Sequence, residues 1–111
     1  MTLADAPDVI VRYLSLAPKA DVDAVVECFT PDAEVIDDGK TYQGHDGIRQ
    51  WRETVASKFT YTIEPVSSQE VDDNGFVVTA RLEGTFPGSP VDLKFGFVLR
   101  DGLIAALEIA P

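Results

Sequence analysis

The sequence has very few of the residues on which disulfide and metal chemistry depend. Among its 111 residues there is one cysteine, Cys28, and one histidine, His45. A lone cysteine forms no internal disulfide, so nothing indicates an oxidising compartment. Zinc sites built from cysteine and histidine need several such ligands, and no glycine-rich phosphate loop is present. We therefore expect neither a metal nor another cofactor.

Basic residues are also scarce. The chain has 9 lysines and arginines against 19 aspartates and glutamates, a formal net charge of −10. Phosphate contacts need clustered lysine and arginine, so this balance argues against nucleic acid and against an anionic membrane surface as partners. No apolar run approaches the roughly 20 residues that span a bilayer, and the acidic first residues show no secretory signal. A cytoplasmic protein with a small apolar molecule as its partner fits these absences.

The composition is otherwise ordinary for a globular protein, with 45% hydrophobic and 25% charged residues. The length predicts one domain over residues 1–111, and no repeat or linker-like stretch divides it. Folding at this size buries roughly 65% of the surface of the unfolded chain, which is enough for one core.

The first third of the chain has helical spacing. Apolar residues over 9–17 recur at helical intervals, and Asp5 is a candidate cap for this helix. Asp21 opens a second, shorter helix, whose apolar side we extend to Phe29. The Thr30-Pro31-Asp32 segment then breaks that helix.

A short strand pair and a third helix follow. We expect a strand over 33–37, a turn at Asp38-Gly39-Lys40 and a second short strand over 41–43. The third helix begins after residues 44–47, and its shared apolar face consists of Ile48, Trp51 and Val55.

The second half alternates between apolar and polar residues, which is typical of β-strands. Pro65 in the first of these strands indicates a bulge or an edge. Three turn signals divide the rest, namely Asp73-Asn74-Gly75, Pro87-Gly88-Ser89-Pro90 and Asp101-Gly102. Four strands in an antiparallel meander result, the last over 103–110. One face would carry Phe76, Leu82, Phe86, Phe95 and Phe97, and the helices must cover it. The fold class is therefore α+β.

Two polar residues occupy positions that the pattern makes apolar. Asp37 shares a strand face with Ala33 and Val35, where it could serve as a general base; alternatively the strand has ended and Asp37 shapes the turn. The pattern alone favours the turn. Tyr13 lies on the apolar stripe of the first helix, either packed in the core or donating a hydrogen bond to a developing oxyanion.

The remaining candidates have simpler interpretations. We place His45 at a helix entry or on the surface, and Cys28 as a small buried residue. A set of five aromatic residues has two interpretations. Such residues more often pack in the core than surround a ligand, yet a cup-shaped α+β domain can leave aromatic surface exposed in a pocket. That set consists of Trp51, Phe76, Phe86, Phe95 and Phe97.

Three segments make the chain similar to the nuclear transport factor 2-like superfamily, which includes ketosteroid isomerases and SnoaL-like polyketide cyclases. The likeness covers nearly the whole chain and implies a cone-shaped fold, with a curved antiparallel sheet wrapped around N-terminal helices and an apolar pocket. It identifies the fold better than the function. The segments are Ala20-Asp21-Val22-Asp23 through Phe29, Thr30-Pro31-Asp32-Ala33-Glu34-Val35, and Tyr42-Gln43-Gly44-His45-Asp46-Gly47-Ile48.

This resemblance assigns roles to two residues. In ketosteroid isomerases a tyrosine of the first helix donates to the oxyanion, and an aspartate ending the first strand is the general base. Tyr13 and Asp37 match those positions. The second oxyanion donor of those enzymes is a protonated acid on a late strand, where this chain has Phe95. A phenyl ring donates no hydrogen bond, so at this position the chain lacks the second oxyanion donor of an efficient steroid isomerase.

Three functions follow as hypotheses. The first is an isomerase- or cyclase-like enzyme for an apolar carbonyl compound, with Asp37 as base, Tyr13 as oxyanion donor and the aromatic set holding the substrate. The second is a non-catalytic domain that binds an apolar ligand. The third, compatible with either, is a homodimer through the outer sheet face, whose residues are Val77, Thr79, Arg81, Glu83, Lys94, Val98 and Arg100.

Overall fold

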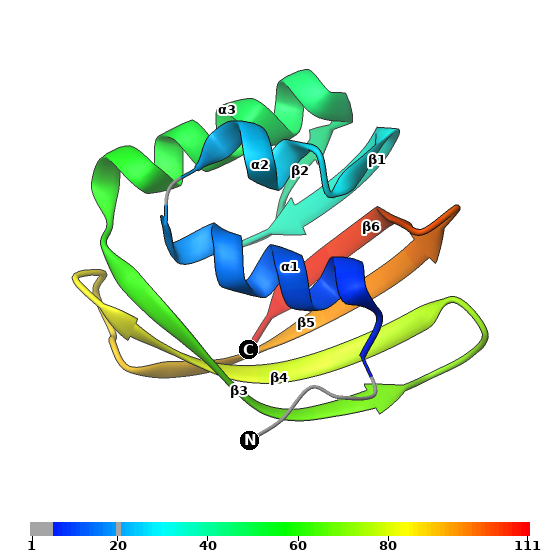
Figure 1. Cartoon of the computed structure of the whole chain (residues 1–111). Coiled ribbons are helices and arrows are strands. Elements are labelled where there is room, and N and C mark those ends of the chain that lie inside the picture. Colours follow the sequence, from blue (N-terminus) through cyan, green and yellow to red (C-terminus); the bar gives the residue numbers. More distant parts are fainter. Residues whose placement is uncertain (1–5, 20) are drawn as a thin grey trace.

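The computed structural model describes residues 6–19 and 21–111, with the side chains of residues 56 and 57 excepted. The described residues form three α-helices, a 3₁₀ turn and six strands (Figure 1). The α-helices and strands follow one another along the chain in the order that the sequence predicts. The elements are α1 (Asp8–Leu16), η1 (Ala17–Lys19), α2 (Val22–Val26), β1 (Phe29–Asp37), β2 (Lys40–Gln43), α3 (Gly44–Lys58), β3 (Tyr61–Glu70), β4 (Gly75–Gly84), β5 (Val91–Arg100) and β6 (Leu103–Ala110).

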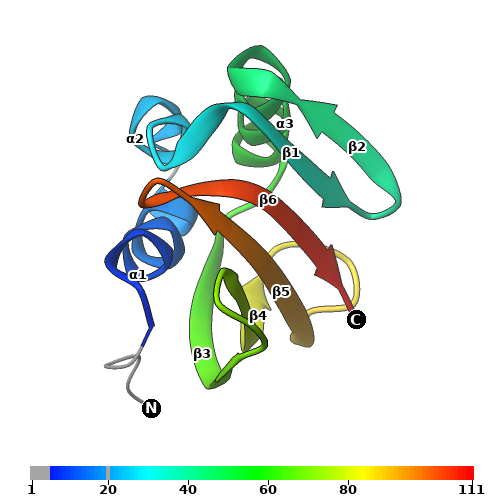
Figure 2. The same ribbon diagram turned by 90° about the vertical axis from the view of Figure 1, so that its right-hand side faces the viewer.

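The six strands form one sheet in the order β2-β1-β6-β5-β4-β3 (Figure 2). The last four strands make the predicted antiparallel meander, and β1 joins it by pairing parallel to β6. The strand β3 is an edge strand, and its register shifts between Pro65 and Ser67. Both features that Pro65 indicated are therefore present, because proline has no N–H to donate to a neighbouring strand.

The curved sheet wraps around the helices, which all lie on its concave side (Figures 1 and 2). The core forms between them: α1 buries Ile10, Tyr13 and Leu14 against the sheet. The inner face of β4 and β5 supplies Val78, Phe95 and Phe97, all at 2% exposure or less. This is the α+β cone that the alternation and the resemblance predict.

The prediction for residues 29–32 was wrong. Helix α2, capped by the Asp21 side chain at the Ala24 N–H, ends at Val26, and Phe29 already belongs to β1. Phe29 is 1% exposed and pairs with Ile104 of β6, so burial and parallel pairing override the turn tendency of Pro31. The pairing with β6 is irregular between Phe29 and Glu34, which accommodates the missing N–H of Pro31.

Further boundaries differ or lie outside the described residues: α3 begins at Gly44 and not after residue 47, and β2 begins at Lys40 and not at Thr41. Strand β4 ends at Gly84, so Phe86 belongs to the connection that follows and not to the alternating strand. Asp5, the candidate cap of α1, lies outside the described residues, and Pro7 occupies the N-cap position. Among the described residues, no helix is long and apolar enough to cross a membrane.

Candidate active site

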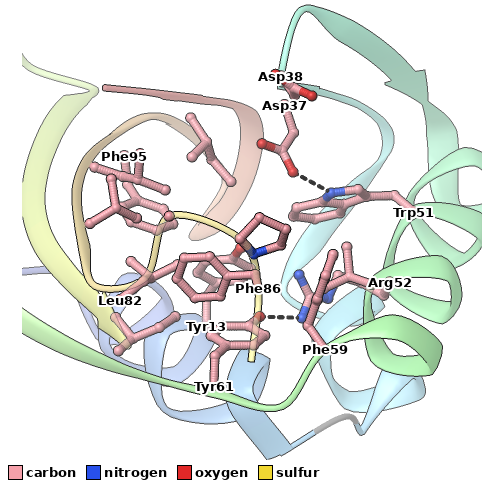
Figure 3. A pocket seen from close by; sticks show the side chains of 17 residues that line it. Tyr13, Asp37, Asp38, Trp51, Arg52, Phe59, Tyr61, Leu82, Phe86 and Phe95 are labelled. Carbon is pink, nitrogen blue, oxygen red and sulfur yellow. Dashed lines mark hydrogen bonds between the residues drawn. The ribbon is translucent and has the colours of Figure 1, made fainter. Parts of the chain in front are cut away.

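A pocket of about 340 Å³ lies between α3 and the inner face of the sheet (Figure 3). This volume is at the lower end of the range for small-molecule sites, roughly 300–1,000 Å³. Most of its wall is apolar, and the apolar side chains are Val55, Phe59, Ile63, Leu82, Phe86, Pro87, Val91, Leu93, Phe95 and Ile109. The polar ones are Tyr13, Asp37, Asp38, Trp51, Arg52 and Tyr61.

Asp37 is the last residue of β1, and its carboxylate lines the pocket. It follows the buried Ala33 and Val35 on the same strand face, and the turn begins only at Asp38, whose φ is 54°. Of the two interpretations of Asp37, the structure therefore supports the inward-facing one. The Trp51 Nε1–H donates to Asp37 Oδ2 at 2.9 Å, the only hydrogen bond to this carboxylate within the described residues (Figure 3). No described residue donates a hydrogen bond to its other oxygen.

Trp51 connects the strand end to α3. Its indole is 2% exposed and lies 6.2 Å from the Tyr42 ring, so the ring is fixed by packing. A side chain held in this way gives its hydrogen-bond partner a defined position. Trp51 therefore acts as a support for the Asp37 carboxylate as well as a wall of the pocket.

Tyr13 reaches the same pocket from α1. Its ring packs edge-on against Phe29 and Phe97, each at 5.8 Å between centroids. Every fully enclosed polar side-chain atom of the described residues has a hydrogen-bond partner, whereas no partner in that part of the chain reaches the Tyr13 hydroxyl. The hydroxyl therefore borders open space, and the pocket is the space that Tyr13 lines. Burial raises the pKa of Tyr13 well above its ordinary value, so it remains a neutral donor.

Arg52 is a pocket residue that the sequence analysis missed. Its side chain is 4% exposed, and Nη2 donates to the Ala17 carbonyl at 2.9 Å and to the Tyr61 hydroxyl at 2.7 Å. The signal was present in the helical spacing, because Ile48, Trp51, Arg52 and Val55 stand at i, i+3, i+4 and i+7. An arginine on an apolar stripe is the kind of exception that marks a site.

The predicted aromatic set divides in two. Trp51, Phe86 and Phe95 line the pocket, and Phe59, which we had not singled out, packs edge-on against Phe86 at 6.3 Å. Phe76 and Phe97 are buried in the core and do not line it. Alternation identifies the inner face of a strand, but the position along that face depends on the curvature of the sheet.

The two residues with simpler interpretations lie away from the pocket. His45 is half-buried in the first turn of α3, and its Nε2 lies 2.9 Å from the Phe29 carbonyl oxygen. Cys28 is buried, and burial raises the pKa of its thiol. Within the described part of the chain, no three histidine, cysteine, aspartate or glutamate side chains gather as a metal site would require.

Comparison with solved structures gives the same fold. A candidate polyketide cyclase from Sinorhizobium meliloti is 39% identical, covers 98% of this chain and 99% of its own, and superimposes with a TM-score of 0.91. SalBIII, an epoxide hydrolase/cyclase-like enzyme in pyran ring formation in the polyether salinomycin, is 24% identical over 93% of this chain and 87% of its own, with a TM-score of 0.81.

A third structure connects the fold to the ketosteroid isomerases. A Catenulispora acidiphila protein with a ketosteroid isomerase-like fold is 14% identical, covers 95% of this chain and 85% of its own, and has a TM-score of 0.83. No curated protein matches the sequence. The SnoaL-like domain model matches residues 10–107, which is nearly the whole chain. The chain therefore belongs to the SnoaL-like domain family, within the nuclear transport factor 2-like superfamily.

Proposed function

We propose that this protein catalyses proton transfer on an apolar carbonyl compound, in a reaction of the isomerase or cyclase type. The observation that carries the proposal is the pairing of two groups in one apolar pocket. Asp37 presents a carboxylate fixed by Trp51, and Tyr13 presents a hydroxyl that has no partner in the described residues. The 39% identity to a candidate polyketide cyclase supports the same class of chemistry.

The proposed reaction begins at the carbon next to the carbonyl. The free oxygen of Asp37 takes a proton from this carbon, and the electron pair of the C–H bond forms a C=C bond. The π pair of the carbonyl moves onto its oxygen, and the Tyr13 hydroxyl donates a hydrogen bond to that enolate oxygen. Return of the proton to a different carbon gives an isomer. Attack of the enolate carbon on a second carbonyl of the same molecule, followed by protonation of the alkoxide by Asp37, gives a ring.

The substrate is held by the apolar wall. We propose that Trp51, Phe86 and Phe95 contact it directly, while Phe76 and Phe97 form the core beneath. An apolar wall also favours the chemistry, because it excludes the water that would otherwise weaken each electrostatic contact. The substrate class is accordingly a compact apolar molecule with an enolisable carbonyl.

Deuterium uptake tests this proposal without knowledge of the natural substrate. The protein is incubated in deuterium oxide with tetralone, a bicyclic apolar ketone, and proton NMR follows the loss of signal at the carbon next to the carbonyl. We expect exchange faster than in buffer alone, and no exchange for naphthalene, which has the same size but no carbonyl. Exchange of tetralone and of further cyclic ketones at the buffer rate would contradict the proposal.

A binding function without catalysis is the second candidate. Phe95 lines the pocket at the position where the resemblance places a second oxyanion donor. The absence of one such donor costs about 3 kcal/mol of transition-state stabilisation, so the pocket has less catalytic power than that of a steroid isomerase. Ligands that bind tightly in the pocket and are recovered unchanged would favour this candidate.

We also propose that the protein is a homodimer through the outer face of the sheet. That face carries a second hollow of about 310 Å³, and Val98 beside it is 48% exposed. Exposed apolar surface around a hollow is typical of protein interfaces. Sedimentation at micromolar concentration should give twice the chain mass of 12.1 kDa, and Val98→Glu should give the monomer. A monomeric wild-type protein would contradict the dimer.

A further inference from the structure

Arg52 is a buried cation that forms no ion pair with a carboxylate of the described residues. The described ion pairs all join exposed side chains on the surface, and Arg52 belongs to none of them. Burying a charge is costly unless another charge or several hydrogen bonds compensate it. Arg52 is 4% exposed, so the free-energy cost of burying its charge is substantial. Its hydrogen-bond partners within the described residues are the Ala17 carbonyl and the Tyr61 hydroxyl.

The hydrogen bonds of the Arg52 guanidinium use only one of its three nitrogens within the described residues. Nη2 donates to the Ala17 carbonyl and to the Tyr61 hydroxyl, whereas Nε and Nη1 donate to no described residue. Since every fully enclosed polar side-chain atom of the described residues has a partner, Nε and Nη1 are not fully enclosed. Arg52 lines the pocket, so these donors have room for a ligand there. Nε and Nη1 point to different sides of the guanidinium, so a ligand carboxylate would accept one charge-assisted hydrogen bond from one of these two nitrogens.

The surroundings keep Arg52 charged and oriented. Burial by itself would lower the pKa of Arg52, but electrostatic interactions with Tyr13, Tyr61 and Asp37 and the hydrogen bond to Tyr61 outweigh this effect, and its pKa is raised. The guanidinium carbon lies 4.7 Å from the centre of the Trp51 ring, at a cation–π distance. Asp37 is held at the Nε1 edge of that same ring and does not form an ion pair with Arg52. The indole therefore contacts both the Asp37 carboxylate and the Arg52 guanidinium.

We propose that Arg52 is a specificity residue that binds an ionised oxygen group, a carboxylate, on the substrate. This inference rests on the proposed function and narrows its substrate class to apolar carbonyl compounds that also carry a carboxylate. The acid group would accept a hydrogen bond from an unused guanidinium nitrogen of Arg52, the carbonyl oxygen would lie at the Tyr13 hydroxyl, and the reacting carbon at Asp37. The apolar body would contact the wall formed by Phe86, Leu93 and Phe95.

The net charge of −10 does not oppose such a ligand. At physiological ionic strength the Debye length is about 8 Å, so the acidic side chains on the outer surface are largely screened from a molecule in the pocket. A contact with a buried guanidinium is screened much less, and its hydrogen bonds to a carboxylate are charge-assisted. Inside the pocket Asp37 and Asp38 are acidic, and Arg52 is the lysine or arginine that lines it within the described residues, so the acid group would lie at this guanidinium.

The test compares two ligands that differ only in charge. Phenylbutyrate and phenylbutyramide share one apolar body, and the indole N–H signal of the single tryptophan reports binding of either one by NMR titration. We expect the carboxylate to bind the wild-type protein about tenfold more tightly than the amide. In Arg52→Gln the two should bind equally. In Arg49→Gln, which removes an exposed arginine of the same helix paired with Asp23, the preference should persist.

Several results would overturn the proposal. These are equal binding of the two ligands to the wild-type protein, failure of the carboxylate to bind at all, and an unchanged preference in a folded Arg52→Gln. The wild-type comparison needs no variant, so it decides the matter even where Arg52→Gln does not fold. The Asp37→Asn variant separates this inference from the proposed function. It should lose proton exchange yet keep the preference for the carboxylate, because the charge of Asp37 is not needed to bind it.

Discussion

The indole N–H of Trp51 donates to the carboxylate of Asp37 at 2.9 Å, and this bond joins the middle of α3 to the last residue of β1. This hydrogen bond fixes the position of one carboxylate oxygen, and no described residue donates a hydrogen bond to the other. The Arg52 guanidinium lies over the same ring. A single tryptophan thereby contacts the Asp37 carboxylate through its N–H and the Arg52 guanidinium through its ring, at the wall of an apolar pocket.

Trp51→Phe keeps an aromatic ring at this position and removes the N–H donor. We expect kcat for proton exchange to fall about a hundredfold, because loss of a fixed position costs that much even where the base remains. KM should change little, since most of the apolar wall is unaffected. The free energy of unfolding should fall by about 2 kcal/mol from the lost hydrogen bond and ring area. If kcat fell and KM rose by the same factor, the change would indicate a general structural defect and not a positioning role for Trp51.

Tyr13→Phe removes a hydroxyl that makes no hydrogen bond within the described residues, while the ring packing on Phe29 and Phe97 stays. The exchange rate should fall by about 10²-fold or more, which is typical for loss of an oxyanion donor. The melting temperature should hardly change. Tyr42→Phe makes the same chemical change in a ring outside the pocket lining and should leave the rate unaltered. A Tyr13→Phe protein with the wild-type rate would remove the hydroxyl from the mechanism.

Tyr13 also makes the stability depend on alkaline pH. Burial raises its pKa above the ordinary tyrosine value of about 10, which applies in the unfolded chain. Above about pH 10 the unfolded chain therefore releases a proton that the folded protein keeps, and the free energy of unfolding falls as the pH rises. Urea unfolding at several values from about pH 8 to pH 11 should show this loss. Tyr13→Phe should lose less stability over that interval, and an identical loss in both proteins would contradict the assignment.

Gly84 allows β3 to approach β4 closely beside the pocket. A Cβ at this position would lie 2.2 Å from the Thr60 carbonyl oxygen and 2.6 Å from the Tyr61 Cα, too close for the backbone to remain in place. Gly84→Ala should destabilise the fold by about 1–3 kcal/mol, as measured by urea unfolding. Gly96→Ala is the matched control in β5, where the nearest atom lies 3.8 Å away. If Gly84→Ala were as stable as the control, the β3 backbone would be able to move away from the added methyl group at no cost, which would contradict this prediction.

The sequence predicted the fold better than the site, for physical reasons. Alternation and turn residues define strands locally, so β6 was placed at its observed bounds and the bulge at Pro65 was found. The strand at Phe29 was missed because its pairing partner, Ile104, lies far along the chain. No local pattern contains that contact, and Pro31 points locally to a turn.

The site depended on contacts between elements that are remote in sequence. Tyr13 and Asp37 were singled out because each is a polar residue at an apolar position. Arg52 met the same criterion on α3, but an arginine beside Trp51 is equally compatible with an exposed helix face. Only the packing of α3 against the sheet shows that its guanidinium is enclosed and meets Tyr61. Phe76 and Phe97 share the inner face with Phe95, and the curved sheet places them beyond the pocket.

Proton exchange by Asp37→Asn tests the central claim most directly. The variant keeps an oxygen that accepts the Trp51 N–H and removes the charge that takes a proton, so folding and tetralone binding should persist. We expect the rate of deuterium uptake by tetralone to fall by at least about 10²-fold, as for loss of a general base. Asp92→Asn, an exposed change on β5, should keep the wild-type rate. A folded Asp37→Asn protein that exchanges tetralone as fast as the wild type would contradict the account.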